Sequence, residues 1–196
     1  MQGIVKKHRK TKETDITIIY GNTEKGTPLV ETGVPFFNHL LTSFAFHGNF
    51  PLDIQAVGDI DVDPHHLVED VGIVLGSLFS DIMLENKPIT RFGHAVIPMD
   101  DALSEAVIDY SGRPHLEYQA EFPQQYSGSF DMSLLKEFFS AFSANARLNL
   151  HLIARNGENS HHIGESLMKA FGRALAQSLV PISNSNGDLS TKGTLT

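Results

Sequence analysis

Apolar residues in the first half of the chain recur with two different periods. Between Asp15 and Tyr20 an apolar or aromatic residue stands at every second position, which is typical of a strand. Phe36, Leu40 and Phe44 recur at the spacing of one helix face. The pattern predicts strands at 4–5, 15–20 and 52–57, and helices at about 35–46 and 64–84.

The second half of the chain repeats this order of elements. Leu134, Phe138 and Phe142 again mark one face of a helix. The predicted elements are strands at 95–97, 106–110, 116–122 and 148–153, and helices at about 131–145 and 161–179. With one short gap, the repeat pairs His65 with His161, Glu69 with Glu165, and His39 with Glu137.

The repeat predicts an α+β fold of two similar half-domains. Each half-domain is expected to be an antiparallel sheet with two helices on one face. We expect the first half-domain at residues 1–88 and the second at 89–182. Residues 183–196 are polar and contain glycine, so they are expected to form a mobile C-terminal arm.

Each repeat carries a His-His-x-x-Glu motif near the start of a helix. The two motifs consist of His65, His66 and Glu69, and of His161, His162 and Glu165. Spacings of three and four residues place such side chains on one rim of a helix. Because the chain has no cysteine, only nitrogen and oxygen ligands are offered, which suit manganese, iron or zinc, and octahedral coordination favours manganese. The doubled motif predicts a binuclear metal site.

Residues near the two motifs are candidates for supporting roles. His39 lies on the preceding helix, either as a further ligand or as a hydrogen-bonded core histidine. His151 lies in the strand before the second motif, and its role as a ligand stays open. Acidic neighbours are expected to orient the histidines; they are Asp61, Asp63, Asp70 and Glu158.

Composition excludes several classes of partner. The formal net charge is −8, with 15 basic and 23 acidic residues, so we expect no nucleic-acid partner and no anionic membrane surface. Residues 1–12 are basic and lack a following apolar run, and no stretch reaches transmembrane length, which favours a soluble cytoplasmic protein. Any phosphate must therefore be held locally.

A group of cationic and hydroxyl side chains suggests such a local phosphate site. Arg91 and Arg113 lie beside glycine or proline at predicted strand ends, where a guanidinium is easily presented to phosphate. Lys169 lies one helical turn beyond Glu165. The C-terminal arm adds Ser190, Thr191 and Lys192.

Several long segments resemble one enzyme family. Asp63-Pro64-His65-His66-Leu67-Val68-Glu69 lies within a stretch at 58–76 that resembles the signature of imidazoleglycerol-phosphate dehydratases. The other matching segments are at 91–93, 98–103, 111–114 and 159–171. The resemblance covers about residues 3–195.

The resemblance implies a fold, a reaction and an assembly. The fold is two half-domains of the type found in domain 2 of ribosomal protein S5. The reaction removes water from imidazoleglycerol phosphate to give imidazoleacetol phosphate in histidine biosynthesis. The resemblance also implies two manganese ions per active site and a homo-oligomeric shell of twenty-four subunits with active sites at subunit interfaces.

The resemblance also assigns roles to residues of this sequence. The implied metal ligands are His39, His65, His66, Glu69, His161, His162 and Glu165, to which the repeat adds Glu137. Substrate contacts are implied for these histidines and Glu69, and also for Glu13, His47, Arg91, Arg113, Lys169, Ser190, Thr191 and Lys192. Glu13 is the expected acid–base group, and Glu69 and Glu165 complete the catalytic set as carboxylates that hold metal.

Two positions depart from the pattern of many family members. Asn38 replaces an aspartate beside His39, which leaves the ligand itself in place. Glu137 stands where many relatives carry a metal-binding histidine; it is either a carboxylate ligand or an exposed helix carboxylate.

Two other functions are compatible with the ligand types alone. A binuclear metallohydrolase would use the same side chains to activate water on a phosphorylated small molecule. A non-catalytic metal-binding or shell-forming protein would take up metal without using the phosphate cluster.

Overall fold

The computed structural model describes residues 4–21, 27–85 and 88–182. The first half contains β1 (Val5–Lys10), β2 (Thr14–Tyr20), β3 (Leu29–Glu31), α1 (Pro35–Gly48), β4 (Leu52–Gly58) and α2 (His65–Glu85). The second half contains β5 (Phe92–Met99), β6 (Ala102–Asp109), β7 (His115–Gln119), β8 (Tyr126–Ser127), β9 (Phe130–Asp131), α3 (Leu134–Ala146), β10 (Asn149–Asn156) and α4 (Ser160–Ser178). The predicted α+β fold of two similar half-domains is therefore confirmed.

The two four-stranded sheets share one topology, with orders β1-β2-β4-β3 and β5-β6-β10-β7. The expectation of purely antiparallel sheets was wrong at one edge of each. β3 pairs with β4 in parallel, and β7 pairs with β10 in parallel. The reason is that a helix connects the paired strands, α1 in the first half and α3 in the second, and such a crossover returns the chain in the same direction.

Some predicted boundaries also differ from the structure. β3 has only three residues, too few to show a period, and was not predicted. β1 is longer than the predicted 4–5, because its exposed lysines and His8 hide the strand pattern while suiting a sheet edge. The predicted helix at 131–145 begins at Leu134, since Phe130 and Asp131 belong to the small β8–β9 hairpin.

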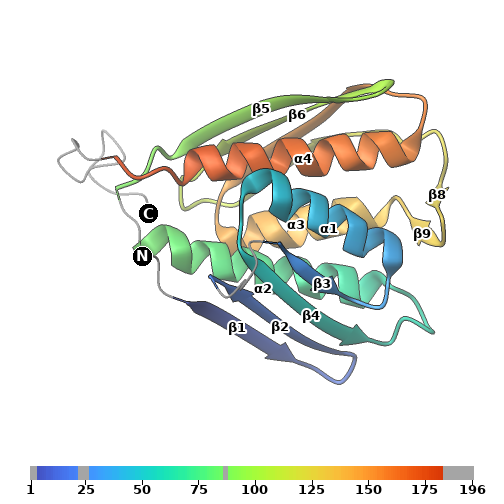
Figure 1. Cartoon of the computed structure of the whole chain (residues 1–196), viewed down its shortest axis with the longest axis horizontal. Coiled ribbons are helices and arrows are strands. Elements are labelled where there is room, and N and C mark those ends of the chain that lie inside the picture. Colours follow the sequence, from blue (N-terminus) through green and yellow to red (C-terminus); the bar gives the residue numbers. More distant parts are fainter. Residues whose placement is uncertain (1–3, 22–26, 86–87, 183–196) are drawn as a thin grey trace.

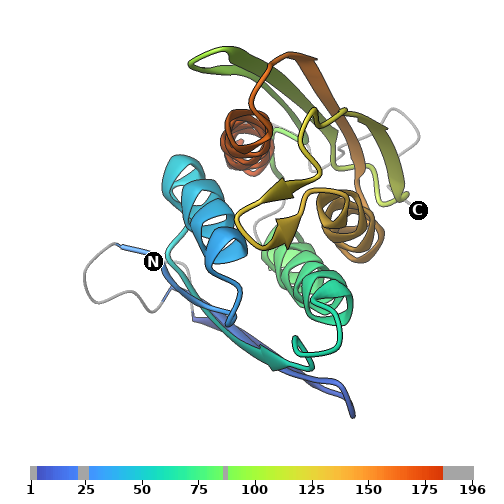
Figure 2. The same cartoon turned by 90° about the vertical axis from the view of Figure 1, so that its right-hand side faces the viewer.

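The four helices lie between the two sheets, so each sheet has helices on one face only (Figures 1 and 2). One hydrophobic core spans both halves. At its centre Phe171 of α4 stacks on Phe44 of α1, with ring centroids 4.9 Å apart, and meets Phe142 of α3 edge-on at 4.9 Å. Aromatic pairs of this kind add to area burial and fix how the helices meet.

Two glycines allow the helices of different halves to approach closely. A Cβ at Gly172 of α4 would lie 2.4 Å from the carbonyl oxygen of Phe44 in α1. A Cβ at Gly76 of α2 would lie 2.5 Å from the carbonyl oxygen of Phe142 in α3. Backbone contact of this kind is possible only where a residue has no side chain. It pairs α1 with α4 and α2 with α3.

The helix N-termini share one end of the molecule. In Figure 1 all four helices start on the right, so His65 at the start of α2 and His161 in the first turn of α4 lie towards the same end. Among the helices of the described segments, none is long and apolar enough to cross a membrane.

Candidate metal centre

Three side chains from both halves form a cluster at this end of the molecule. His161 and Glu165 lie one turn apart on α4, and His39 reaches them from α1. The Oε2 atom of Glu165 is 3.3 Å from His39 Nε2 and 3.4 Å from His161 Nε2. One ligand atom from each residue lies within 4.8 Å of the others, so the three suit a single cation.

The surroundings of Glu165 favour the ionised form of its carboxylate, which is the form that binds a cation. Its side chain is 11% exposed, and Lys169 Nζ lies 2.9 Å from Oε1. Burial raises the pKa of Glu165, but the neighbouring Lys169 and His39 outweigh burial, so this pKa lies below its usual value. The carboxylate is therefore ionised at neutral pH, and its Oε2 faces the two imidazoles.

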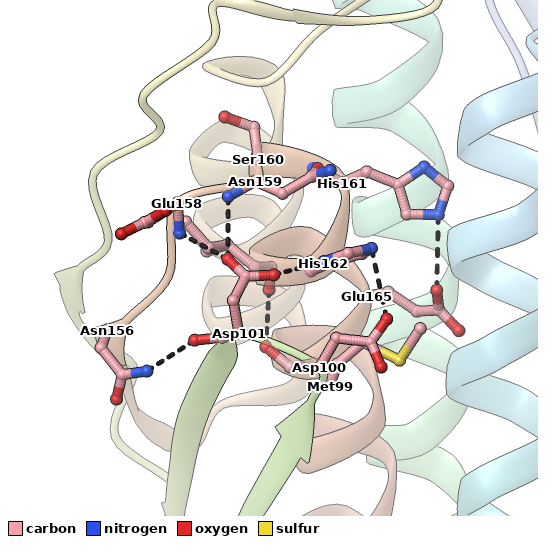
Figure 3. A network of polar contacts seen from close by, with 12 residues as sticks. Met99, Asp100, Asp101, Asn156, Glu158, Asn159, Ser160, His161, His162 and Glu165 are labelled. Carbon is pink, nitrogen blue, oxygen red and sulfur yellow. Dashed lines mark hydrogen bonds and ion pairs between the residues drawn. The ribbon is translucent and has the colours of Figure 1, made fainter.

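His162 points away from this cluster, towards the β5–β6 hairpin (Figure 3). Its Nδ1 atom lies 2.5 Å from Oδ1 of Asp101, and its Nε2 atom lies 3.6 Å from Oδ2 of Asp100. The hydrogen bond with Asp101 raises the pKa of His162 and lowers that of Asp101 far below its usual range. The side chains of His161 and His162, neighbours in one motif, therefore contact different parts of the molecule.

The first half has a second cluster around His66. Its Nδ1 atom is 3.1 Å from Oδ2 of Asp59 and 3.8 Å from Oε2 of Glu13. Glu13 lies in the β1–β2 hairpin and Asp59 in the loop between β4 and α2. The hydrogen bond with Asp59 raises the pKa of His66. His66 thus repeats the role of His162, with its Nδ1 held by a carboxylate and its Nε2 available.

The chain is similar in sequence to the proteins of one enzyme family. The family model for imidazoleglycerol-phosphate dehydratase matches residues 32–175. Imidazoleglycerol-phosphate dehydratase of Gluconobacter oxydans is 47% identical over 189 residues, which are 96% of this chain and 96% of that protein. The enzyme of Shouchella clausii is 46% identical over 187 residues, 95% of this chain and 96% of that protein.

Solved structures agree with the sequence relatives. The crystal structure of imidazoleglycerol-phosphate dehydratase from Staphylococcus aureus matches with a TM-score of 0.83 and 39% identity, covering 92% of this chain and 100% of that one. The structure from Pyrococcus furiosus matches with a TM-score of 0.82 and 36% identity, covering 95% and 99%. The chain belongs to the imidazoleglycerol-phosphate dehydratase family.

Membership of the dehydratase family makes this chain a hydro-lyase of histidine biosynthesis. Its ligand chemistry agrees with a metal-dependent dehydratase. The clusters offer imidazole nitrogens and carboxylate oxygens only, and the cluster of His39, His161 and Glu165 lies where helices of different halves meet. Divalent ions of the manganese, iron and zinc group accept this donor set, so the residues present fit such an ion.

The counterpart of the His39 cluster is less complete. The pseudo-symmetric residues are His65 and Glu69 on α2 and Glu137 on α3, and α2 packs on α3 as α1 packs on α4. Within the ranges that the structure covers, these three side chains are not among the ligand clusters that lie within 4.8 Å. Glu137 as a ligand therefore stays a prediction.

Different aspartates orient the histidines than those expected from the sequence. Asp59 and Asp101 hold the Nδ1 atoms, and both were missed. Asp70 instead binds Arg9 at 3.1 Å and the Thr14 hydroxyl at 2.5 Å. Asp63 accepts the backbone N–H of His65, and Glu158 donates only its backbone N–H to Asp101.

Local spacing in the sequence could not identify Asp101 as the partner of His162, because the two residues are 61 positions apart. The weak signal that exists is the adjacent pair Asp100-Asp101 between two predicted strands. A tight turn of this kind presents short acidic side chains at the end of a sheet. Asp61 makes no polar contact that the structure assigns to the motif.

The predicted phosphate-binding residues that the structure describes lie at separate places in the fold. Arg91 precedes β5, donates its backbone N–H to the carbonyl of Ser178 at the end of α4, and binds Asp109 at 2.6 Å. Arg113 lies exposed in the loop after β6, near Arg91. Lys169, by contrast, lies beside Glu165. Ser190, Thr191 and Lys192 lie outside the described residues.

His47 lies at the end of α1, on the α4 side. It lines a cavity of about 490 Å³ together with His94 and Arg173. Burial, followed by the nearby charges of Lys169 and Arg173, lowers the pKa of His47. The predicted contact of His47 with the substrate stays a prediction. His151 instead lies near His115 in the second sheet, with ring centroids 5.8 Å apart, so the structure gives it no place in the metal cluster.

Proposed function

We propose that the protein converts imidazoleglycerol phosphate to imidazoleacetol phosphate with two manganese ions per active site. The observation that carries the proposal is the cluster of His39, His161 and Glu165, which comes from both halves and has its ligand atoms within 4.8 Å. Bound manganese would act as a Lewis acid towards the imidazole ring and make it an acceptor of charge.

The chain's carboxylates divide into two kinds under this proposal. Glu165 and, by pseudo-symmetry, Glu69 hold metal together with His39, His65, His66, His161, His162 and Glu137. Glu13 is 55% exposed in its hairpin and contacts His66 only at 3.8 Å, so its carboxylate is accessible to a substrate and able to move a proton. We assign to it the removal of the proton from the carbon next to the one that loses its hydroxyl. The enol that results becomes the ketone.

The substrate's phosphate end requires residues that one chain does not bring near its own metal cluster. The 19 residues of α4 span about 28 Å at 1.5 Å per residue. His161 lies at the start of this helix, and Arg91 bonds to its last residue. A molecule with one ring, three further carbons and a phosphate is far shorter than this span.

The span supports active sites at subunit interfaces of a homo-oligomer, for which we keep the proposed twenty-four subunits. Arg91 and Arg113 of one subunit would then meet His47 and Lys169 of a neighbour around the phosphate. Ser190, Thr191 and Lys192 of the C-terminal arm complete this proposed contact. In closed symmetric assemblies such heterologous contacts are repeated identically in every subunit.

A turnover experiment tests the reaction itself. Imidazoleglycerol phosphate is incubated with the purified protein and manganese, and the product is analysed by mass spectrometry and by derivatisation of ketones. We expect loss of one water, a ketone and no free phosphate. Release of inorganic phosphate without a ketone would show a metallohydrolase instead.

A complementation experiment tests the shared site. Arg113→Ala and His161→Ala should each be nearly inactive alone. When both variants are expressed together, random assembly should give active sites with both intact faces in about a quarter of cases, since each face is intact in half of the subunits. The measurement is specific activity of the purified mixed oligomer.

The matched control is a mixture of Arg113→Ala with Arg91→Ala, in which every site lacks one phosphate contact. This mixture should not recover. Activity of the first mixture no higher than the sum of its components would rule out shared sites.

A further inference from the structure

The hairpin between β5 and β6 is connected to the start of α4 through one carboxylate. Oδ1 of Asp101 lies 2.5 Å from His162 Nδ1. Its Oδ2 accepts the backbone N–H groups of Glu158 at 2.6 Å and Asn159 at 3.0 Å. The backbone carbonyl of Asp101 accepts the side-chain amide of Asn156 at 2.7 Å (Figure 3). The strand, the loop and the helix start are thus held at one point.

These bonds determine which nitrogen of His162 is available. A carboxylate only accepts, so the nitrogen that faces Asp101 must carry the hydrogen, and Nε2 of the neutral ring keeps its lone pair. Nε2 points to the open side, where the 71% exposed Asp100 is its neighbour at 3.6 Å. The ring is thereby set in the form that binds a metal ion before any ion arrives.

The same bonds position the whole motif. Oδ2 of Asp101 fixes the backbone of Glu158 and Asn159, and the side chain of Asn159 in turn accepts the backbone N–H of His161 at 2.9 Å. This cap satisfies N–H groups at the start of α4 that have no partner within the helix. The angle at which α4 leaves the loop therefore depends on Asp101, and with it the place of His161 and Glu165.

The first half holds its counterpart differently. His66 Nδ1 contacts Asp59 at 3.1 and 3.4 Å, and Asp59 belongs to the loop that leads directly into the helix of His66. Asp101 belongs to the hairpin of two strands of the sheet. Within the described segments, the histidine ring of the second half is therefore held by a carboxylate from a hairpin far away in sequence, whereas that of the first half is held by a carboxylate that directly follows β4 and precedes the histidine's own helix.

We propose that Asp101 is a positioning residue for the metal centre, which holds His162 with Nε2 free for a divalent ion and sets the direction of α4. The proposal rests on the metal dependence proposed above. It assigns to Asp101 no contact with the substrate and no proton transfer.

The experiment compares Asp101→Asn and Asp101→Ala with the wild-type oligomer. Asparagine keeps a neutral acceptor for the cap and for the ring, whereas alanine removes both. Binding of manganese is measured by the electron paramagnetic resonance signal of the free ion during titration. We expect the affinity to fall by about 10- to 100-fold in the alanine variant and by less in the asparagine variant. Thermal unfolding of the metal-free proteins checks that they are folded, and if the alanine variant is not, the asparagine variant alone decides.

Glu158→Gln is the matched control, because it removes one charge beside the same helix start while only the backbone of Glu158 binds Asp101. It should bind manganese as the wild type does. Equal weakening by Glu158→Gln and Asp101→Asn, or wild-type affinity of both Asp101 variants, would overturn the proposal.

A second readout separates this proposal from the proposed function. In metal-free protein with ¹⁵N-labelled histidine, the nitrogen shifts of His162 should show the hydrogen on Nδ1 in the wild type and a mixture of tautomers in the alanine variant. If the wild-type protein takes up no manganese, the proposed function fails, and these signals alone decide the role of Asp101. Unchanged nitrogen shifts of His162 in the Asp101→Ala variant would refute the proposed role of Asp101.

Discussion

Removal of the divalent metal abolishes turnover of imidazoleglycerol phosphate, and manganese restores it: this is the largest effect that we expect. His39, His161 and Glu165 converge within 4.8 Å, and this set of nitrogen and oxygen donors suits a divalent cation. A metal that stabilises developing charge contributes several kcal/mol to a reaction barrier, so its loss should lower kcat by about 1,000-fold or more.

The measurement is kcat after dialysis against a chelator, followed by titration with manganese. Thermal unfolding and the size of the oligomer are recorded at each step, so that loss of structure is not mistaken for loss of chemistry. Undiminished turnover in protein shown to contain less than one percent of its metal would remove the proposed mechanism, although family membership would stand.

The fold was predictable because its elements repeat. The apolar period of Phe36, Leu40 and Phe44 recurs at Leu134, Phe138 and Phe142, and these side chains do belong to two equivalent helices that face the core. The hydrophobic pattern fails to predict a strand that is too short to show a period or whose period is hidden by charged residues. The three-residue β3 and the basic β1 are examples, and with β3 the parallel edge of the sheet was missed as well.

The metal centre was predictable only along one helix at a time. The spacing of His161 and Glu165 follows from helical geometry, and the structure confirms their proximity. The position of His39 beside this pair depends on how closely α1 approaches α4. Gly172 permits the close approach, because it has no side chain and lies against the backbone of Phe44. The periodicity of apolar residues along the sequence gives no information on the distance between two helices.

The residues that orient the histidines were not predictable for the same reason. Asp70 is one residue from Glu69 in sequence, yet it binds Arg9 and Thr14 on the neighbouring sheet. Asp101, 61 residues from His162, is its actual partner. Proximity along the chain favoured the wrong carboxylates, because residues adjacent on a helix point in different directions.

Glu13 is the position at which a single substitution should have the next largest effect. Glu13→Gln keeps the shape and removes the ability to accept a proton, so kcat should fall by about 100-fold or more if this group carries the proton transfer. KM for imidazoleglycerol phosphate should change little, since the amide still hydrogen-bonds. The measurement is the steady-state rate at saturating manganese, and Glu31→Gln, another exposed carboxylate of the first sheet, is the matched control.

A second explanation for such a loss must be separated from acid–base catalysis. Glu13, Asp59 and His66 also lie within 4.8 Å of one another, so Glu13 is itself placed to hold an ion. If it is a ligand, Glu13→Gln should weaken manganese binding, and excess manganese should recover part of the rate. If it moves the proton, manganese affinity should equal that of the wild type while kcat stays low at every metal concentration. Because Asp59 already binds the histidine ring at 3.1 Å and Glu13 only approaches it at 3.8 Å, we expect the second result.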